Sequence, residues 1–488
     1  MRLDAHVAHE RLAPLNRLTE ELLRDSRTPG IAVAVVLGEE TILARGYGYA
    51  DLAARRLLDS KTVYPIASTT KAMNATLLGM LVDEGLLTWD ACVQRYLPQF
   101  RLNDAALSAQ VTVRDLIVMR TGLPRHDWMW IGYPTDRASL VRGLAFLERS
   151  AGFRERFQYN NLTAMTTGYL AEVVTGQSWE TLIRNRLLNP LGMSSTHFSQ
   201  PNSGNVTLSY HENVRRELIV TRRVSAEVTG PSGGSIHSTV DDMTRWLRFN
   251  LSDGCVASRR LIESQTLKDI HTPNIVAPVD QGAPSDRATY GLGWFVDTYQ
   301  DQLRISHSGY LDDVQSSVTL LPEARIGVVS FVNFGPVGMA PAFTEQVLDL
   351  LLGRPPSLAL SEKMKEYERR VEDRRVCIAA TTRVPQTAPS HTLEAYAGNY
   401  EHPGYGLVEI RCRGQRLELV RGEFCLPLEH WHFDAWVVRD SDLIPIHIQS
   451  ALDRSNRLLF ETNADGAIAA LTIPLEPTVA PIRFSKTS

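Results

Sequence analysis

Strand patterns near both ends of the first 350 residues enclose a long helical stretch, and this order limits the fold more than any other feature. A continuous β-branched run at Ile31–Leu37 and a second strand at Thr41–Tyr49 are separated by a short turn, which predicts a hairpin. Residues 90–255 have mainly helical periodicity, and strand patterns return after residue 285. The later strands are expected at Tyr290–Asp297, Leu303–Ser308, Gln315–Leu321 and Ile326–Asn333. This order predicts an α+β fold: one antiparallel sheet built from both ends of the region, flanked by helices, with the middle as an all-helical lobe.

The C-terminal part has a different pattern, made of short and evenly spaced alternating strands. Six strands are expected there, at Gly406–Arg411, Arg416–Arg421, Phe424–Glu429, Trp436–Arg439, Leu458–Thr462 and Ile468–Pro474. Such strands are typical of a small all-β barrel or sandwich. We therefore predict a first domain at residues 1–355, a charged linker at 356–390 with a helix at Ser361–Arg375, and a β domain at 391–488.

Composition restricts the class of protein. The chain is 43% hydrophobic and 22% charged with a net charge of −4, which predicts a globular protein with no nucleic-acid partner. No apolar run approaches the ~18 residues of a membrane span, and the first residues lack the pattern of a signal peptide, so no membrane partner is expected. The five cysteines are scattered and have no C-x-x-C spacing. This predicts reduced thiols in a cytoplasmic protein, with no metal and no cofactor.

Ser68 and Lys71 lie three residues apart at the predicted start of an apolar helix. Side chains at this spacing share one helix face, with about 5–6 Å between their Cβ atoms, so an amine is within reach of a hydroxyl. Serine needs such a base to become a nucleophile. A helix N-terminus would also favour a neutral lysine and a developing oxyanion. Because the spacing recurs by chance, its meaning depends on partners elsewhere in the chain.

One candidate partner is Tyr159, which stands beside Asn160 and Asn161 just before a predicted helix. A phenolate near a lysine can act as a general base, and an amide can orient the carbonyl of a substrate. The alternative is that Tyr159 only packs its ring and that Asn161 caps the helix.

A second candidate is the end of a predicted strand at His307, Ser308 and Gly309. Glycine lets the backbone approach a ligand closely, so the next N–H, of Tyr310, could pair with the N–H of Ser68 as an oxyanion hole. The alternative for His307 is an ordinary strand histidine.

In order and spacing, these three stretches resemble the motifs of the class C β-lactamase-like group of serine hydrolases. That group includes penicillin-binding D,D-peptidases, D-amino-acid amidases and peptidases, esterases and acyltransferases. Its S-x-x-K is matched by Ser68–Lys71, its Y-x-N by Tyr159–Asn161, and its third box, K-T-G or H-x-G, by His307–Gly309. The resemblance covers roughly residues 10–350, and the tail from about residue 390 is similar to the lipocalin-like domain often appended to this family.

The resemblance implies a serine hydrolase that cleaves a peptide, amide or ester bond through an acyl-enzyme on Ser68, with Lys71 and Tyr159 as base. The substrate would be a small molecule or short peptide. His307 in place of lysine favours esterase or peptidase relatives over β-lactamases and D,D-carboxypeptidases, and near its usual pKa of about 6.5 it would add pH dependence. An acyltransferase and a non-catalytic binding protein with a relict site stay open, as does a homo-oligomer.

Substrate-binding residues are expected around the three motifs, first among them Asn161, Ser308, Gly309 and Tyr310. Asp312 and Asp313 follow the third box, where an acidic pair could receive a substrate amine. Trp128 and Trp130 lie in a loop expected to overhang the cleft, where they could bind a bulky apolar group. The alternative for this loop is that its aromatic side chains pack inside the lobe and its arginines form a solvated face.

Overall fold

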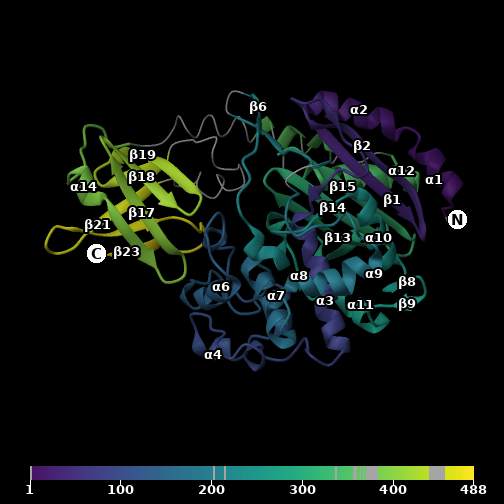
Figure 1. The fold of residues 1–488 in the computed structure, drawn as a ribbon, viewed down its shortest axis with the longest axis horizontal. Coiled ribbons are helices and arrows are strands. Elements are labelled where there is room, and N and C mark those ends of the chain that lie inside the picture. The colour runs from purple at the N-terminus through teal and green to yellow at the C-terminus, as the bar shows by residue number, and fades with distance from the viewer. Residues whose placement is uncertain are drawn as a thin grey trace.

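The computed structural model contains an α+β body and a separate β-barrel at one end of the molecule (Figure 1). It describes residues 3–201, 204–213, 216–335, 338–355, 360–362, 364–366, 368–369, 383–438 and 457–487. The predicted linker at 356–390, with its charged helix at Ser361–Arg375, falls largely outside these residues. Within the described part of the chain, no helix is both long and apolar enough to cross a membrane.

A nine-stranded antiparallel sheet forms the centre of the body, in the order β10-β11-β12-β13-β14-β15-β1-β2-β3. Its strands are β1 (Gly30–Leu37), β2 (Glu40–Asp51), β3 (Arg56–Leu57), β10 (Ile275–Val276), β11 (Thr289–Tyr290), β12 (Phe295–Tyr299), β13 (Gln302–Leu311), β14 (Val314–Leu321) and β15 (Ile326–Val332). β1 pairs antiparallel with β15, with Ile31 opposite Val332. The early and late strands therefore share one sheet, and the predicted fold class is confirmed.

Helices cover both faces of this sheet. Successive side chains of a strand point to opposite faces, so neighbouring residues of β1 pack against different helices. Ile31 and Val33 belong to a buried cluster with α1 (Ala5–Leu12) and α12 (Met339–Leu352). Ala32 and Ala34 belong to the larger core, which contains the long helices of the other face. These helices, with the lobe beyond them, are α3 (Thr70–Asp83), α4 (Ala105–Ser108), α5 (Val113–Ile117), α6 (Arg137–Gly143), α7 (Asn161–Thr175), α8 (Trp179–Ile183), α9 (Asn189–Leu191), α10 (Val240–Leu251) and α11 (Ser264–Ile270).

The C-terminal strands form a closed antiparallel barrel. Its members are β16 (Gly398–His402), β17 (Gly406–Arg413), β18 (Arg416–Arg421), β19 (Phe424–His432), β20 (Ala435–Val438), β21 (Arg457–Thr462), β22 (Ile468–Ile473) and β23 (Ile482–Thr487). The predicted end of one strand at Arg439 lies outside the described residues. The sequence patterns predict six of these strands and miss β16 and β23. These two pair with each other, with Asn399 opposite Thr487, and close the barrel.

Candidate active site

Ser68 lies in a short 3-10 turn, η1 (Ala67–Thr69), which leads directly into α3. Ala67 has a φ of 49°, a left-handed conformation that costs a non-glycine residue roughly 1–3 kcal/mol and is often found at functional sites. β13 passes close by: a Cβ on Gly309 would lie 2.8 Å from the Ser68 nitrogen and 2.7 Å from the Ile66 oxygen. Only glycine lets the strand approach Ser68 this closely.

The part of β13 beside Ser68 is an open edge. In the described sheet, β12 pairs with β13 only as far as Ser306, which lies opposite Phe295. Residues 307–311, which contain the predicted Ser308, Gly309 and Tyr310, therefore have no strand on that side. This part of β13 therefore borders Ser68 without an intervening strand.

Lys71 is 1% exposed and reaches three oxygen atoms. Its Nζ lies 3.1 Å from Ser68 Oγ, 2.8 Å from Asn161 Oδ1 and 2.5 Å from the carbonyl oxygen of Ser232. Burial, and then the charge of Arg125, lower the pKa of Lys71 well below its usual value. In the neutral amine, the two hydrogens are donated to Asn161 and Ser232, and the lone pair is left for the hydroxyl hydrogen of Ser68.

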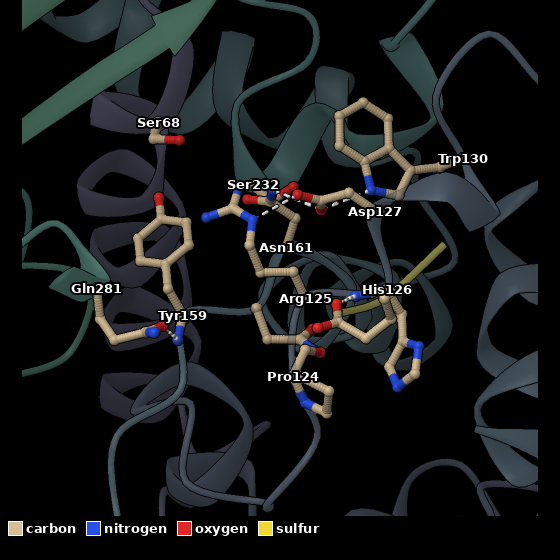
Figure 2. A network of polar contacts seen from close by, with 12 residues as sticks. Ser68, Pro124, Arg125, His126, Asp127, Trp130, Tyr159, Asn161, Ser232 and Gln281 are labelled. Carbon is tan, nitrogen blue, oxygen red and sulfur yellow. Dashed lines mark hydrogen bonds and ion pairs between the residues drawn. The ribbon is translucent and has the colours of Figure 1, made fainter. Parts of the chain in front are cut away.

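Tyr159 comes from the segment before α7, and its hydroxyl points toward Ser68 (Figure 2). Its ring lies near two basic side chains, with its centroid 4.7 Å from Lys71 Nζ and 5.0 Å from Arg125 Cζ. Burial raises the pKa of Tyr159 to about 12, although hydrogen bonding with Ser68 and the charge of Arg125 oppose the rise. The hydroxyl is therefore protonated at neutral pH and can donate a proton.

Asn160, and not Asn161, caps α7. The side-chain oxygen of Asn160 accepts the Thr163 N–H at 2.9 Å, so the alternative role of Asn161 as the cap is wrong. The Asn161 side chain instead bridges Lys71 and Asp127. Its Oδ1 accepts from Lys71, and its Nδ2 donates to Asp127 Oδ1 at 3.0 Å.

His307 is a buried neutral histidine in β13. Its Nδ1 lies 2.6 Å from the Ser308 carbonyl oxygen, which only accepts, so Nδ1 carries the hydrogen. Its Nε2 then accepts from the Tyr290 hydroxyl at 3.2 Å. Burial, and then the charge of Lys71, lower the pKa of His307 to about 3. The prediction that His307 titrates near its usual pKa is therefore wrong.

The acidic pair after the third box lies in the turn between β13 and β14. Asp313 is fully buried, and its carboxylate accepts from the Tyr310 hydroxyl and, at 2.7 Å, from Thr221 Oγ1. Burial raises the pKa of Asp312 to about 7, and the charge of Arg223 opposes this rise. A substrate amine would have to displace the partners of Asp313, and a role of this pair in binding an amine stays a prediction.

The two tryptophans of the loop are buried and lie in different surroundings. Trp128 packs against the barrel, with its ring centroid 5.6 Å from that of Phe424. Trp130 donates from Nε1 to Asp127 Oδ1 at 3.1 Å. Both side chains are thus packed in the core, as the alternative has it, although Trp128 packs partly against the barrel. A role of either residue in substrate binding stays a prediction.

Sequence reasoning did not identify two residues of this loop, Arg125 and Asp127, as part of the site. The alternative of a solvated face fits the 51% exposure of the Arg125 side chain, but its guanidinium also extends toward Tyr159 and Ser68 (Figure 2). Its Nε donates to Asp127 Oδ2 at 2.6 Å. No local pattern signals this, because Asp127 acquires its role from Asn161, which lies 34 residues further along the chain.

His126 attaches this loop to the barrel. It is fully buried, has a φ of 47°, and donates its backbone N–H to Glu476 Oε2 at 3.0 Å. Its Nε2 lies 2.8 Å from the Glu148 carbonyl oxygen and therefore carries the ring hydrogen, so Nδ1 accepts from the Tyr405 hydroxyl at 2.7 Å. Burial lowers the pKa of His126, which favours this neutral form.

We expect Tyr405→Phe to destabilise the protein, because it leaves His126 Nδ1 buried without a donor. An unsatisfied buried polar group costs about 1–3 kcal/mol. Thermal and chemical unfolding of the variant should show a lowered midpoint. Tyr169→Phe is the matched control, since the Tyr169 hydroxyl makes no hydrogen bond among the described residues. Equal midpoints for both variants would show that the attachment contributes no stability.

Comparisons with known proteins identify relatives of both parts of the chain. A family model described as Beta-lactamase matches residues 15–351, and one described as Domain of unknown function (DUF3471) matches residues 382–486. Unguisins hydrolase ungD' of Aspergillus campestris is 28% identical over 413 residues, which cover 78% of this chain and 74% of the relative. Protein flp of Staphylococcus aureus is 27% identical over 328 residues, which cover 65% of this chain and 62% of that protein.

A solved structure has a similar fold over nearly the whole chain. It is the octameric penicillin-binding protein homologue from Pyrococcus abyssi, with a TM-score of 0.63 and 21% sequence identity, and the match covers 97% of this chain and 100% of that chain. At this identity the likeness shows the fold alone.

Proposed function

The chain belongs to the beta-lactamase family, whose members are serine hydrolases, and on that premise we propose that it cleaves a peptide, amide or ester bond through an acyl-enzyme on Ser68. The observation that carries the proposal is the 3.1 Å distance between Ser68 Oγ and the Nζ of a buried lysine whose pKa is lowered. A neutral amine at this distance can take the serine proton as the hydroxyl attacks a carbonyl.

In the proposed acylation step, Lys71 takes the hydroxyl proton of Ser68 while Oγ bonds to the carbonyl carbon. The protonated Tyr159 then donates its proton to the departing nitrogen or oxygen and recovers one from Lys71. Water subsequently attacks the acyl-enzyme and releases the acid. Lys71 and Tyr159 take the proton of the water and return one to Ser68 Oγ. Positioned acid and base groups of this kind typically contribute about 10²–10⁴-fold to the rate.

The backbone N–H groups of Ser68 and Tyr310 are the proposed oxyanion hole. The close approach of Gly309 to the Ser68 nitrogen and the open edge of β13 support this assignment. Donors aimed at the developing negative charge are each worth about 10²–10³ in rate. Asn161 would orient the substrate carbonyl from the other side, through the amide that also holds Lys71.

The proposal is tested by labelling with a serine-directed phosphonate and intact-mass spectrometry. We expect one adduct on the wild-type protein and none on Ser68→Ala. A panel of esters, D- and L-amino acid amides, short peptides and a chromogenic β-lactam then gives the acyl group. An equal adduct on both proteins would contradict the proposal.

The pH dependence of kcat/KM is expected to follow Lys71 and not His307. Lys71 is a base only when neutral, so activity should fall as the pH falls through its lowered pKa and level off above it. His307, with a pKa of about 3, stays neutral over this range. Profiles measured from about pH 5 to about pH 9 should therefore have the same shape for wild type and His307→Gln. An acid limb that His307→Gln removes would contradict this assignment.

A further inference from the structure

Arg125 holds a guanidinium group beside Tyr159 that the proposed acylation chemistry does not use. The side chain extends from its loop toward Tyr159 and Ser68 (Figure 2), and Cζ lies 5.0 Å from the Tyr159 ring centroid. The Arg125 side chain nevertheless remains 51% exposed, so a ligand bound next to Tyr159 can reach it.

The hydrogen-bonding fork of Arg125 is only partly used. Its Nε donates to Asp127 Oδ2 at 2.6 Å, and within the described residues neither Nη nitrogen has a hydrogen-bond partner. The other Asp127 oxygen is taken by Asn161 and Trp130. Asp127 therefore orients the guanidinium and leaves its outer edge free, which is the edge that can bind a carboxylate through two parallel hydrogen bonds.

Arg125 is also the basic group of this site that stays charged. The pKa of Lys71 and that of His307 are both lowered, mainly by burial, so both groups favour the neutral form. A guanidinium remains protonated at any pH at which a protein works. A negatively charged substrate would therefore meet a permanent positive charge at Arg125, beside the nucleophile.

The position of Arg125 is fixed by contacts of the two residues that follow it. His126 is tied to Glu476 and Tyr405 of the barrel, and Asp127 is tied to Asn161 at the start of α7. A cation held in this way loses little conformational freedom when a ligand binds, which favours binding. The barrel thus helps to fix the loop that carries Arg125.

We propose that Arg125 binds a carboxylate of the acyl substrate, close to the bond that Ser68 attacks. The substrate class is then acidic acyl compounds: esters, amides or peptides with a carboxylate a few bonds from the scissile carbonyl. The inference rests on the proposed function, because it names the substrate of that same site.

The test compares two esters that differ in one charge, mono-4-nitrophenyl glutarate and its neutral methyl ester. We expect wild type to prefer the charged ester and Arg125→Gln to lose about 10- to 100-fold in kcat/KM for it, the amount expected from one charge-assisted hydrogen-bonded contact. The neutral ester should change little. Arg125→Lys keeps the charge without the fork and should retain part of the preference.

Arg17→Gln is the matched control. Arg17 is an exposed residue of α2 (Leu15–Ser26), paired with Glu21, and its replacement changes the net charge by the same amount. It should leave both rates unchanged. Thermal unfolding of the Arg125 variants checks that they fold.

Three results would overturn the proposal: no preference in wild type, an equal loss on both esters in Arg125→Gln, or a loss explained by a shifted pH profile. The last two would mean that Arg125 acts only on Lys71 and Tyr159. Calorimetric binding of the charged ester to Ser68→Ala, with and without Arg125→Gln, needs no turnover. If the charged ester bound in an Arg125-dependent way but was not hydrolysed in a Ser68-dependent way, the proposed function would be refuted and this inference would be supported. If binding were the same with and without Arg125→Gln, this inference would be refuted.

Discussion

Ser68→Ala is expected to abolish turnover while the fold stays intact. The substitution removes one hydroxyl that is partly exposed and contacts Lys71 Nζ at 3.1 Å, and the backbone of η1 is unchanged. Loss of the nucleophile in a serine hydrolase lowers kcat by about 10⁴- to 10⁶-fold, because the remaining groups have no atom to transfer the acyl group to. A substitution of this kind typically changes stability by about 0.5 kcal/mol or less.

The measurement is kcat on the best substrate of the panel, with the unfolding midpoint determined alongside. Ser194→Ala, at an exposed serine after α9, is the matched control and should keep full activity. Activity of Ser68→Ala close to wild type would show that another residue attacks the substrate.

Most of the main sheet could be predicted from the sequence because its principal strands are long and apolar, but local patterns miss the two-residue strands β3 and β10 and one break. A single strand is expected at Tyr290–Asp297, whereas the structure has β11 and β12, with a turn closed by the Gly291 N–H and the Trp294 carbonyl at 2.8 Å. Gly293 has a φ of 78°, and a Cβ there would lie 2.5 Å from the Lys71 carbonyl oxygen. The break therefore comes from contact with α3, which the sequence of the strand does not reveal.

Ser68 and Lys71 could be predicted as a pair because their signal is also local. Ser68 and Lys71 are brought together by helix periodicity alone, so their spacing carries the information. Arg125 and Glu476 have no such signal, because the contact that fixes the loop joins His126 to a residue 350 positions away. Trp128 shows the same limit, since its partner Phe424 belongs to the barrel.

Tyr159→Phe is expected to impair cleavage in a way that depends on the leaving group. The variant keeps the ring, which packs against Phe157 and lies beside Lys71, and loses only the hydroxyl. A hydroxyl with a pKa near 12 is a proton donor, and amides need a proton on the departing nitrogen far more than nitrophenyl esters need one on oxygen. We expect about 10²–10⁴-fold loss of kcat/KM on an amide and a much smaller loss on a 4-nitrophenyl ester.

Lys71→Met separates the role of the base from that of the proton donor. It removes the base that activates Ser68 and should therefore slow cleavage of the amide and of the ester alike. Single-turnover acylation rates on a matched amide and ester pair measure the difference between the two variants. If Tyr159→Phe slowed both substrates equally, the tyrosine would act on Ser68 itself. The lowered pKa of Lys71 would then serve mainly to keep the amine neutral, so that no positive charge opposes proton transfer from Ser68 to a Tyr159 phenolate. If Tyr159→Phe changed neither rate, Lys71 would handle both protons, and the burial of Tyr159 would be a matter of packing against Phe157 alone.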